Sequence, residues 1–149
     1  MHVRVHPSKE RVLDVANTQV LVVEDNERNM KLLRDVLAAA GYRTLEAASG
    51  QEAIELATEH LPDLVLMDLR LPDIDGVEAL GRLRADERTA SIPVLAVTAQ
   101  AMHGDRERFL AAGFDDYIAK PVDVAGLVGT VREYCHNRAS RRRDESPEA

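Results

Sequence analysis

The sequence has few of the features that mark secreted or membrane proteins. Its single cysteine, Cys135, cannot form a disulfide within the chain, and residues 1–18 lack the continuous apolar stretch of a signal peptide. No apolar run approaches the ~20 residues that a membrane span needs. We therefore expect a cytoplasmic protein without a membrane partner.

An excess of positive charge is also missing. The formal net charge is −7 at pH 7. A negatively charged chain is repelled by phosphate-rich surfaces, which opposes binding to nucleic acid or to an anionic membrane. Protein or metal partners are expected instead, and at 149 residues the chain is expected to form one domain.

What the chain does contain is a regular alternation of short apolar runs with helix-like segments. The runs cover residues 20–23, 42–47, 64–67, 92–97 and 117–119. Strands separated by helical patterns imply βαβ units and a parallel sheet. We predict an α/β fold from this alternation.

Two of the helix-like segments carry an apolar stripe at steps of three and four residues, which is typical of a helix packed on one side. The stripes are Met30, Leu33, Leu37 and Ala40 in the first segment, and Val124, Leu127, Val128, Val131 and Cys135 in the last. Asp123 is placed to cap the last helix, and Ser49 with Glu52 has the pattern of a capping box. Gly41 and Gly113 are predicted to end helices in the left-handed conformation.

The two ends of the chain differ from this body. Residues 1–17 hold only a weak apolar cluster and are expected to form a packed arm or a disordered extension. Residues 137–149 run basic and then acidic, which predicts a solvated, disordered tail. The folded domain is predicted to span residues 18–136.

Polar residues stand where four of the apolar runs end. Glu24 and Asp25 follow the first run, Asp68 the third, Thr98 the fourth and Lys120 the fifth. The carboxyl ends of parallel strands share one edge of a sheet, where ligands bind. These five side chains are therefore expected to converge, although a single aspartate after a strand is more often a helix cap or a solvated turn.

The three carboxylates predict a metal site. Like charges ~4 Å apart repel by about 4 kcal/mol per pair at an effective dielectric constant of 20, so a cation is required among them. Mg²⁺ prefers carboxylate oxygens, water and phosphate. The five histidines are scattered without ligand spacing, which argues against a softer metal. Residues 73–76 resemble the start of a calcium loop, but no glutamate stands at its twelfth position, so a turn opening a helix is predicted there.

Lys120 and Thr98 complete the predicted chemistry. Lysine is a point charge suited to phosphate oxygens, and the threonine hydroxyl is a hydrogen-bond donor. With a metal and a carboxylate nucleophile on the same edge, these groups favour acyl-phosphate formation at Asp68. Positioning and charge neutralisation would supply most of the rate.

Together these residues resemble the receiver domain of bacterial two-component response regulators, the CheY-like family. The motifs lie within residues 18–135 in the family's order and spacing: VVEDN at 22–26, LMD at 66–68, LPDIDG at 71–76, VTA at 97–99 and YIAKP at 117–121. Residues 29–32, 41–45 and 101–105 are most like single-domain members that regulate cell division.

The resemblance implies a flavodoxin-like (βα)5 fold, a doubly wound parallel sheet of strand order 2-1-3-4-5. It implies that Asp68 accepts a phosphoryl group from a sensor histidine kinase or a histidine phosphotransferase. The metal would be Mg²⁺, held by Glu24, Asp25, Asp68 and the backbone carbonyl of Arg70. The side chain of Arg70 would remain free near Asp68, where it could slow or assist the attack of water.

The resemblance also assigns a switch and an output. Lys120 would act with Thr98 at the phosphoryl group, Thr98 and Tyr117 would form the switch, and the Lys120–Pro121 bond would be cis. The chain would catalyse only its own phosphoryl transfer and autodephosphorylation. Its output would be a downstream effector protein bound on the fourth helix, fifth strand and fifth helix, without direct DNA binding, by a monomer or weak dimer.

Three other functions make different demands on the sequence. An aspartate-based phosphatase of the haloacid dehalogenase type would need a second aspartate two residues after the first, where this chain has Arg70. A flavin-binding electron carrier would need a glycine- and hydroxyl-rich phosphate loop, whereas Glu24 and Asp25 would repel a phosphate. A receiver-fold scaffold that works without phosphorylation stays open, and would predict unchanged partner binding in Asp68→Asn.

Overall fold

The computed structural model describes residues 17–99 and 105–145, the last nine of these as helical backbone only. The strands are β1 (Gln19–Val23), β2 (Arg43–Ala47), β3 (Leu64–Asp68), β4 (Val94–Thr98) and β5 (Asp116–Ala119). The helices are α2 (Glu27–Ala39), α3 (Gly50–His60), α4 (Gly76–Ala85), α5 (Asp105–Ala112) and α6 (Val124–Glu145). The predicted N-terminal extension, except Asn17, and residues 101–104 of the last family-like stretch lie outside the described residues.

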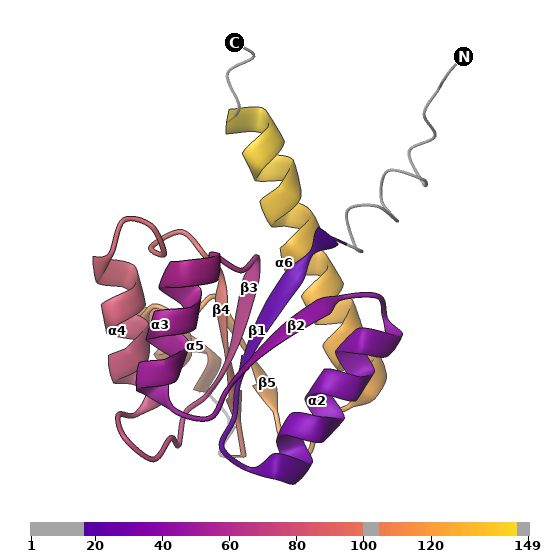
Figure 1. Ribbon diagram of the computed structural model, residues 1–149, viewed down its shortest axis with the longest axis vertical. Helices are drawn as coiled ribbons and strands as arrows, with labels where there is room; N and C mark the ends of the chain where they lie inside the picture. The colour runs from indigo at the N-terminus through magenta and orange to yellow at the C-terminus, as the bar shows by residue number, and fades with distance from the viewer. Residues whose placement is uncertain (1–16, 100–104, 146–149) are drawn as a thin grey trace.

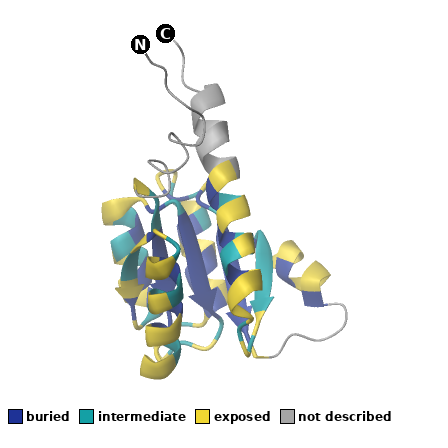
Figure 2. Ribbon diagram, turned by 90° about the vertical axis from the view of Figure 1, so that its right-hand side faces the viewer, coloured by how far each residue is buried: buried dark blue, intermediate teal, exposed yellow. Residues whose placement is uncertain are grey.

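All five strands are parallel and lie in the order β2-β1-β3-β4-β5, which confirms the predicted doubly wound α/β fold. Helices α3, α4 and α5 cover one face of the sheet, and α2 and α6 cover the other (Figure 1). The central strands are buried between these layers, while the outward sides of the helices are exposed (Figure 2).

Each face of the sheet has its own hydrophobic core, because successive strand residues point to opposite sides. Leu21, Val65 and Met67 belong to the core beneath α3, α4 and α5. Their strand neighbours Val22 and Leu66 belong to the core beneath α2 and α6. Burial on both faces explains why these strands are continuous apolar runs rather than alternating ones.

The predicted helix ends are confirmed. The amide of Glu52 donates to Ser49 Oγ at 3.1 Å, and the Glu52 carboxylate accepts from the amide of Ala48 at 2.9 Å, one residue before the cap. Asp123 caps α6 by accepting from the amide of Gly126 at 3.0 Å. Gly41 and Gly113 have φ values of 99° and 111°, which few residues other than glycine adopt.

Helix α6 differs from its prediction at both ends. Leu127, Val131 and Cys135 are buried, but Val124 is 48% exposed, since it begins the helix and the packed face starts one turn later. The helix also continues past residue 136 and remains helical through Glu145, where a solvated coil was expected. Residues 137–145 contain alanine and four arginines, which are good helix formers, and Pro147 stands beyond the end.

Candidate functional site

The parallel sheet brings the predicted polar residues to one edge. Glu24 follows β1, Asp68 ends β3, Thr98 ends β4 and Lys120 follows β5. The register aligns these ends: Val23 pairs with Met67, Asp68 with Val97, and Thr98 with Ala119. Asp68 and Thr98 are the last strand residues rather than the first loop residues, so the sheet itself fixes their backbones.

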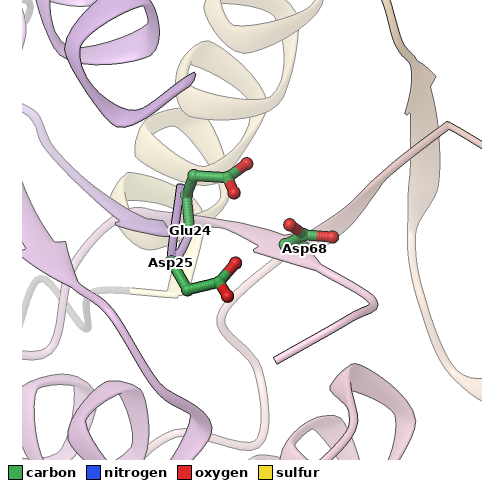
Figure 3. A group of neighbouring side chains, drawn as sticks. All are labelled: Glu24, Asp25 and Asp68. Carbon is green, nitrogen blue, oxygen red and sulfur yellow. The ribbon is translucent and has the colours of Figure 1, made fainter. Parts of the chain in front are cut away.

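Three carboxylates form a compact group at this edge. One oxygen each from Glu24, Asp25 and Asp68 lies within 4.8 Å of the others, and the three side chains face a common space (Figure 3). Glu24 is 2% exposed and Asp68 7% exposed, whereas Asp25 lies at the surface. Hard oxygen donors with one open side fit a small divalent cation that keeps part of its water shell, as Mg²⁺ does.

Lys120 reaches into the same group from β5. Its Nζ donates to Glu24 Oε1 at 3.0 Å and to Asp68 Oδ2 at 3.2 Å. With all three carboxylates in their charged form, the one ammonium leaves two negative charges unbalanced, which is the charge of one divalent cation. The peptide bond between Lys120 and Pro121 is cis, as the resemblance implied.

Burial and pairing shift the pKa values of two of these groups. Burial raises the pKa of the Glu24 carboxyl, Asp68 raises it further, and the hydrogen bonds from Lys120 and the Asn26 amide offset this only in part. Burial lowers the pKa of the Lys120 ammonium, but its hydrogen bonds and attraction to Glu24 and Asp68 outweigh that loss, so its pKa is raised. Lys120 therefore stays positively charged at neutral pH.

Backbone amides bind the second carboxylate oxygens of Glu24 and Asp68. The amide of Asn26 donates to Glu24 Oε2 at 3.1 Å, and the amide of Arg70 donates to Asp68 Oδ1 at 3.1 Å. The Asp68 carboxylate is thus oriented by a lysine on one oxygen and by a backbone amide on the other. Arg70 itself is exposed two residues beyond Asp68.

The two predicted switch residues lie on neighbouring strands. Thr98 is buried, and its carbonyl accepts from the amide of Lys120 at 2.8 Å. Tyr117 is half-buried, with its ring 5.4 Å from that of Phe109 on α5. Tyr117 pairs in register with Ala96, two residues before Thr98.

Two polar side chains have roles that the sequence did not reveal. The segment 73–76 was predicted to open a helix, and Asp75 does cap α4 by accepting from the Glu78 amide at 2.8 Å. Asp73, however, accepts from two amides at the start of α3, more than twenty residues earlier in the chain. Arg84 likewise bonds to segments up to 31 residues away. No local spacing signals such partners.

Relatives of known sequence cover most of the chain. The family model described as the response regulator receiver domain matches residues 20–132. The polar-differentiation response regulator DivK of Brucella ovis is 50% identical over 115 residues, which is 77% of this chain and 94% of the relative. DivK of Brucella anthropi is 49% identical over the same shares.

Solved structures agree in fold and in family. The receiver domain of the sensor histidine kinase PA1611 from Pseudomonas aeruginosa PAO1, with a magnesium ion coordinated in its active-site cleft, is 39% identical. It has a TM-score of 0.74 and covers 80% of this chain and 98% of its own. A CheY-like receiver domain from Methanospirillum hungatei is 27% identical, with a TM-score of 0.73 and coverages of 83% and 98%. Within the described residues, no helix combines the length and apolar character that crossing a membrane requires. With its motifs, strand order and acidic edge in agreement, this chain belongs to the response regulator receiver domain family.

Proposed function

We propose that Asp68 is the phospho-acceptor of this receiver domain and that a sensor histidine kinase or histidine phosphotransferase is its donor. An oxygen of Asp68 attacks the phosphorus of the phosphohistidine and forms a P–O bond. The P–N bond breaks, and the imidazole leaves with the electron pair and takes up a proton. The observation that carries this proposal is a buried Asp68 whose two oxygens are already oriented by Lys120 and the Arg70 amide.

The neighbouring residues have distinct proposed tasks. Glu24, Asp25, Asp68 and the backbone carbonyl of Arg70 hold Mg²⁺, which when bound neutralises charge on the phosphoryl oxygens. Lys120 moves from the carboxylates to a phosphoryl oxygen. The donor set supports this assignment, because it offers only hard oxygens and lacks two positive charges.

Thr98 and Tyr117 are the proposed switch. A charge-assisted hydrogen bond from Thr98 to the phosphoryl group contributes about 1.5–3 kcal/mol, whereas inverting a 1:99 equilibrium needs about 5.5 kcal/mol. Lys120 and repacking of Tyr117 supply the rest, or the activated form is already partly populated. Relaxation-dispersion NMR on the unphosphorylated protein tests the second option, because a flat profile at Tyr117 and its neighbours counts against it.

The proposed output is binding of an effector protein on α5, β5 and α6, the surface nearest Tyr117. The chain would catalyse only its own phosphorylation and the hydrolysis of its acyl phosphate. Arg70 is proposed to set the rate of that hydrolysis, since its exposed side chain starts two residues from Asp68. The phosphate lifetime in Arg70→Ala, compared with wild type, tests this role.

Intact mass measurement tests the central proposal. After incubation with Mg²⁺ and a small phosphodonor, the wild-type chain is expected to gain one phosphoryl group and Asp68→Asn none. An adduct that persists in Asp68→Asn, or is absent from both, contradicts the assignment. If effector binding is the same in wild type and Asp68→Asn, the protein is a phosphorylation-independent scaffold.

A further inference from the structure

Asp73 connects the loop that follows Asp68 to a different helix. It lies in the β3–α4 loop (residues 69–75), and its Oδ1 and Oδ2 accept from the amides of Gly50 and Gln51, each at 2.8 Å. These are the first two residues of α3. The carboxylate therefore bridges two elements, although Asp73 is itself exposed.

The rest of the loop is fitted against the same helix end. A Cβ on Gly50 would lie 2.5 Å from Ile74 Cγ1, so Ile74 packs directly on the first residue of α3. At the loop's closing end, the amide of Gly76 donates to the carbonyl of Leu69 at 3.0 Å. The loop is thus short, closed on itself and attached sideways to α3 by adjacent residues 73 and 74.

The start of α3 is in turn connected to the carboxylate group. β2 ends at Ala47, just before α3, and its carbonyl accepts from the amide of Glu24 at 2.9 Å. Glu24 and Asp68 share the Lys120 ammonium. The contacts therefore close a ring, from Asp68 through its loop to Asp73, across the start of α3 to Ala47, and back through Glu24 and Lys120.

We propose that Asp73 is a positioning residue for the phosphoryl site: it holds the β3–α4 loop against α3 and so fixes the backbone of Arg70 relative to the carboxylates of Glu24, Asp25 and Asp68. The inference rests on the proposed function, because it concerns the same carboxylates as a magnesium site. Without the bridge, the loop can shift away from α3. The Arg70 carbonyl, which is the loop's contribution to the proposed ligand set, then loses its fixed distance from the carboxylates that β1 and β3 hold in place.

The test compares Asp73→Ala and the milder Asp73→Asn with a matched control, Ser49→Ala. Ser49 caps the same helix α3 through a hydrogen bond to Glu52, but Ser49→Ala leaves the bridge to the loop intact. Removing groups that orient metal ligands typically lowers metal affinity 10–100-fold, and Asp73 acts one step further away, so we expect a loss of about 5–10-fold. Calorimetric titration with Mg²⁺ alone measures it.

Three further readouts separate positioning from general destabilisation and from charge. The Arg70 amide resonance is expected to shift in both Asp73 variants and to stay in place in Ser49→Ala. The Mg²⁺ concentration that half-saturates phosphorylation is expected to rise about 5–10-fold while the maximal rate at saturating Mg²⁺ changes less. Repeating the Mg²⁺ titration near 0.5 M salt screens the long-range effect of the charge on residue 73. A loss of Mg²⁺ affinity that is caused by a shift of the loop is expected to persist at that salt concentration.

The outcomes are distinct. If wild type binds Mg²⁺ and is phosphorylated but both Asp73 variants match it, the positioning role is overturned and the proposed function stands. Equal losses in Ser49→Ala and the Asp73 variants also overturn it, because helix capping would then explain the effect. If wild type neither binds Mg²⁺ nor accepts a phosphoryl group, the proposed function fails and the inference with it.

Discussion

The two edges of the sheet differ in how their carboxylates are paired with cationic side chains. At the amino ends of β4 and β5, the Arg84 guanidinium faces one carboxylate, that of Asp115, at 2.9 Å. Its other acceptors are the carbonyls of Ala90, Ile92 and Gly113, at 3.0, 2.6 and 3.0 Å. Asp115 also accepts from the amide of Val94 at 2.8 Å. This pair is charge-balanced, and its hydrogen bonds join α4 to the starts of two strands.

The carboxyl edge also combines carboxylates with a cationic side chain, but in a different ratio. Three carboxylates face the single ammonium of Lys120, and two of them are buried. At the amino edge Arg84 and Asp115 neutralise each other without a bound ion. At the carboxyl edge the carboxylates outnumber the ammonium, so negative charge remains unpaired among these four side chains. The difference teaches that an ion pair completes the charge at one edge of the sheet, whereas at the other edge it leaves the negative charge on which the proposed cation site depends.

Removing the structural cation should have the largest effect on stability. Arg84→Met is expected to lower the free energy of unfolding by about 2–3 kcal/mol, which is below the ~3–5 kcal/mol for breaking a buried pair because Arg84 and Asp115 are both partly exposed. Urea unfolding followed by circular dichroism measures this loss. Lys120→Met in millimolar Mg²⁺ is the counterpart and should lose less, since bound Mg²⁺ still offsets two of the three carboxylate charges; an equal loss would show that both edges are structural.

Adding Mg²⁺ should stabilise only one edge. At 100 times the dissociation constant, a ligand that binds the folded state raises the free energy of unfolding by about 2.7 kcal/mol. Wild type and Asp115→Asn are expected to show the same Mg²⁺-dependent gain, although Asp115→Asn starts from a lower stability. Asp25→Asn is expected to lose most of the gain, and a full gain in that variant would place the metal elsewhere.

Two glycines of α4 give a matched pair for the loop beside Asp68. A Cβ on Gly76 would lie 2.8 Å from the carbonyl oxygen of Asp68 and 2.9 Å from Leu69 Cα, whereas nothing lies within 4 Å of a Cβ on Gly81. Gly76→Ala is expected to lower the free energy of unfolding by about 1–3 kcal/mol through overpacking. Gly81→Ala should raise it by up to about 1 kcal/mol, because alanine favours helix. Thermal unfolding of both variants checks the opposite signs.

The smallest effect expected is a pH dependence at Asp73. The hydrogen bonds from the Gln51 and Gly50 amides lower the pKa of Asp73 from 3.8 to about 2. A carboxyl whose pKa is lower in the folded state stabilises the fold above its unfolded pKa and loses that contribution as pH falls through its folded pKa. The melting temperature of Asp73→Asn should therefore lie below that of wild type above pH ~4 and approach it near pH 2.

Ser49→Ala is the control for this titration. Its hydroxyl caps the same helix but does not ionise in this range. The difference in melting temperature between Ser49→Ala and wild type should therefore stay constant between pH 4 and pH 2. A difference that shrinks in both variants would assign the pH dependence to another group.

The fold and most of the site followed from local patterns. Apolar runs marked all five strands to within two residues, and the ends of those runs located Glu24, Asp25, Asp68, Thr98 and Lys120 at one edge. These predictions succeeded because strand order and parallel pairing turn sequence position directly into position along that edge. The helix caps at Ser49 and Asp123 succeeded because a cap bonds to residues within one turn.

The predictions that failed or were missed depend on distant partners. Val124 belongs to an apolar stripe by spacing, but spacing does not reveal where the packed face of α6 begins. Arg84 and Asp73 are ordinary surface residues in sequence. Asp73 meets its donors on α3, and Arg84 meets Gly113 and Asp115, only when segments more than twenty residues apart come together. Hydrogen bonds of that kind require the completed layers of the fold.

The sequence by itself thus determined the α/β class, the strand ends and the acidic edge, because hydrophobic periodicity and polar residues at strand ends are local properties. Only the tertiary structure decided how that edge is held. It placed Lys120 between Glu24 and Asp68, balanced Arg84 at the opposite edge, and set Asp73 on the start of α3. Such contacts arise from packing, since the distance between two side chains on different elements depends on how those elements are stacked.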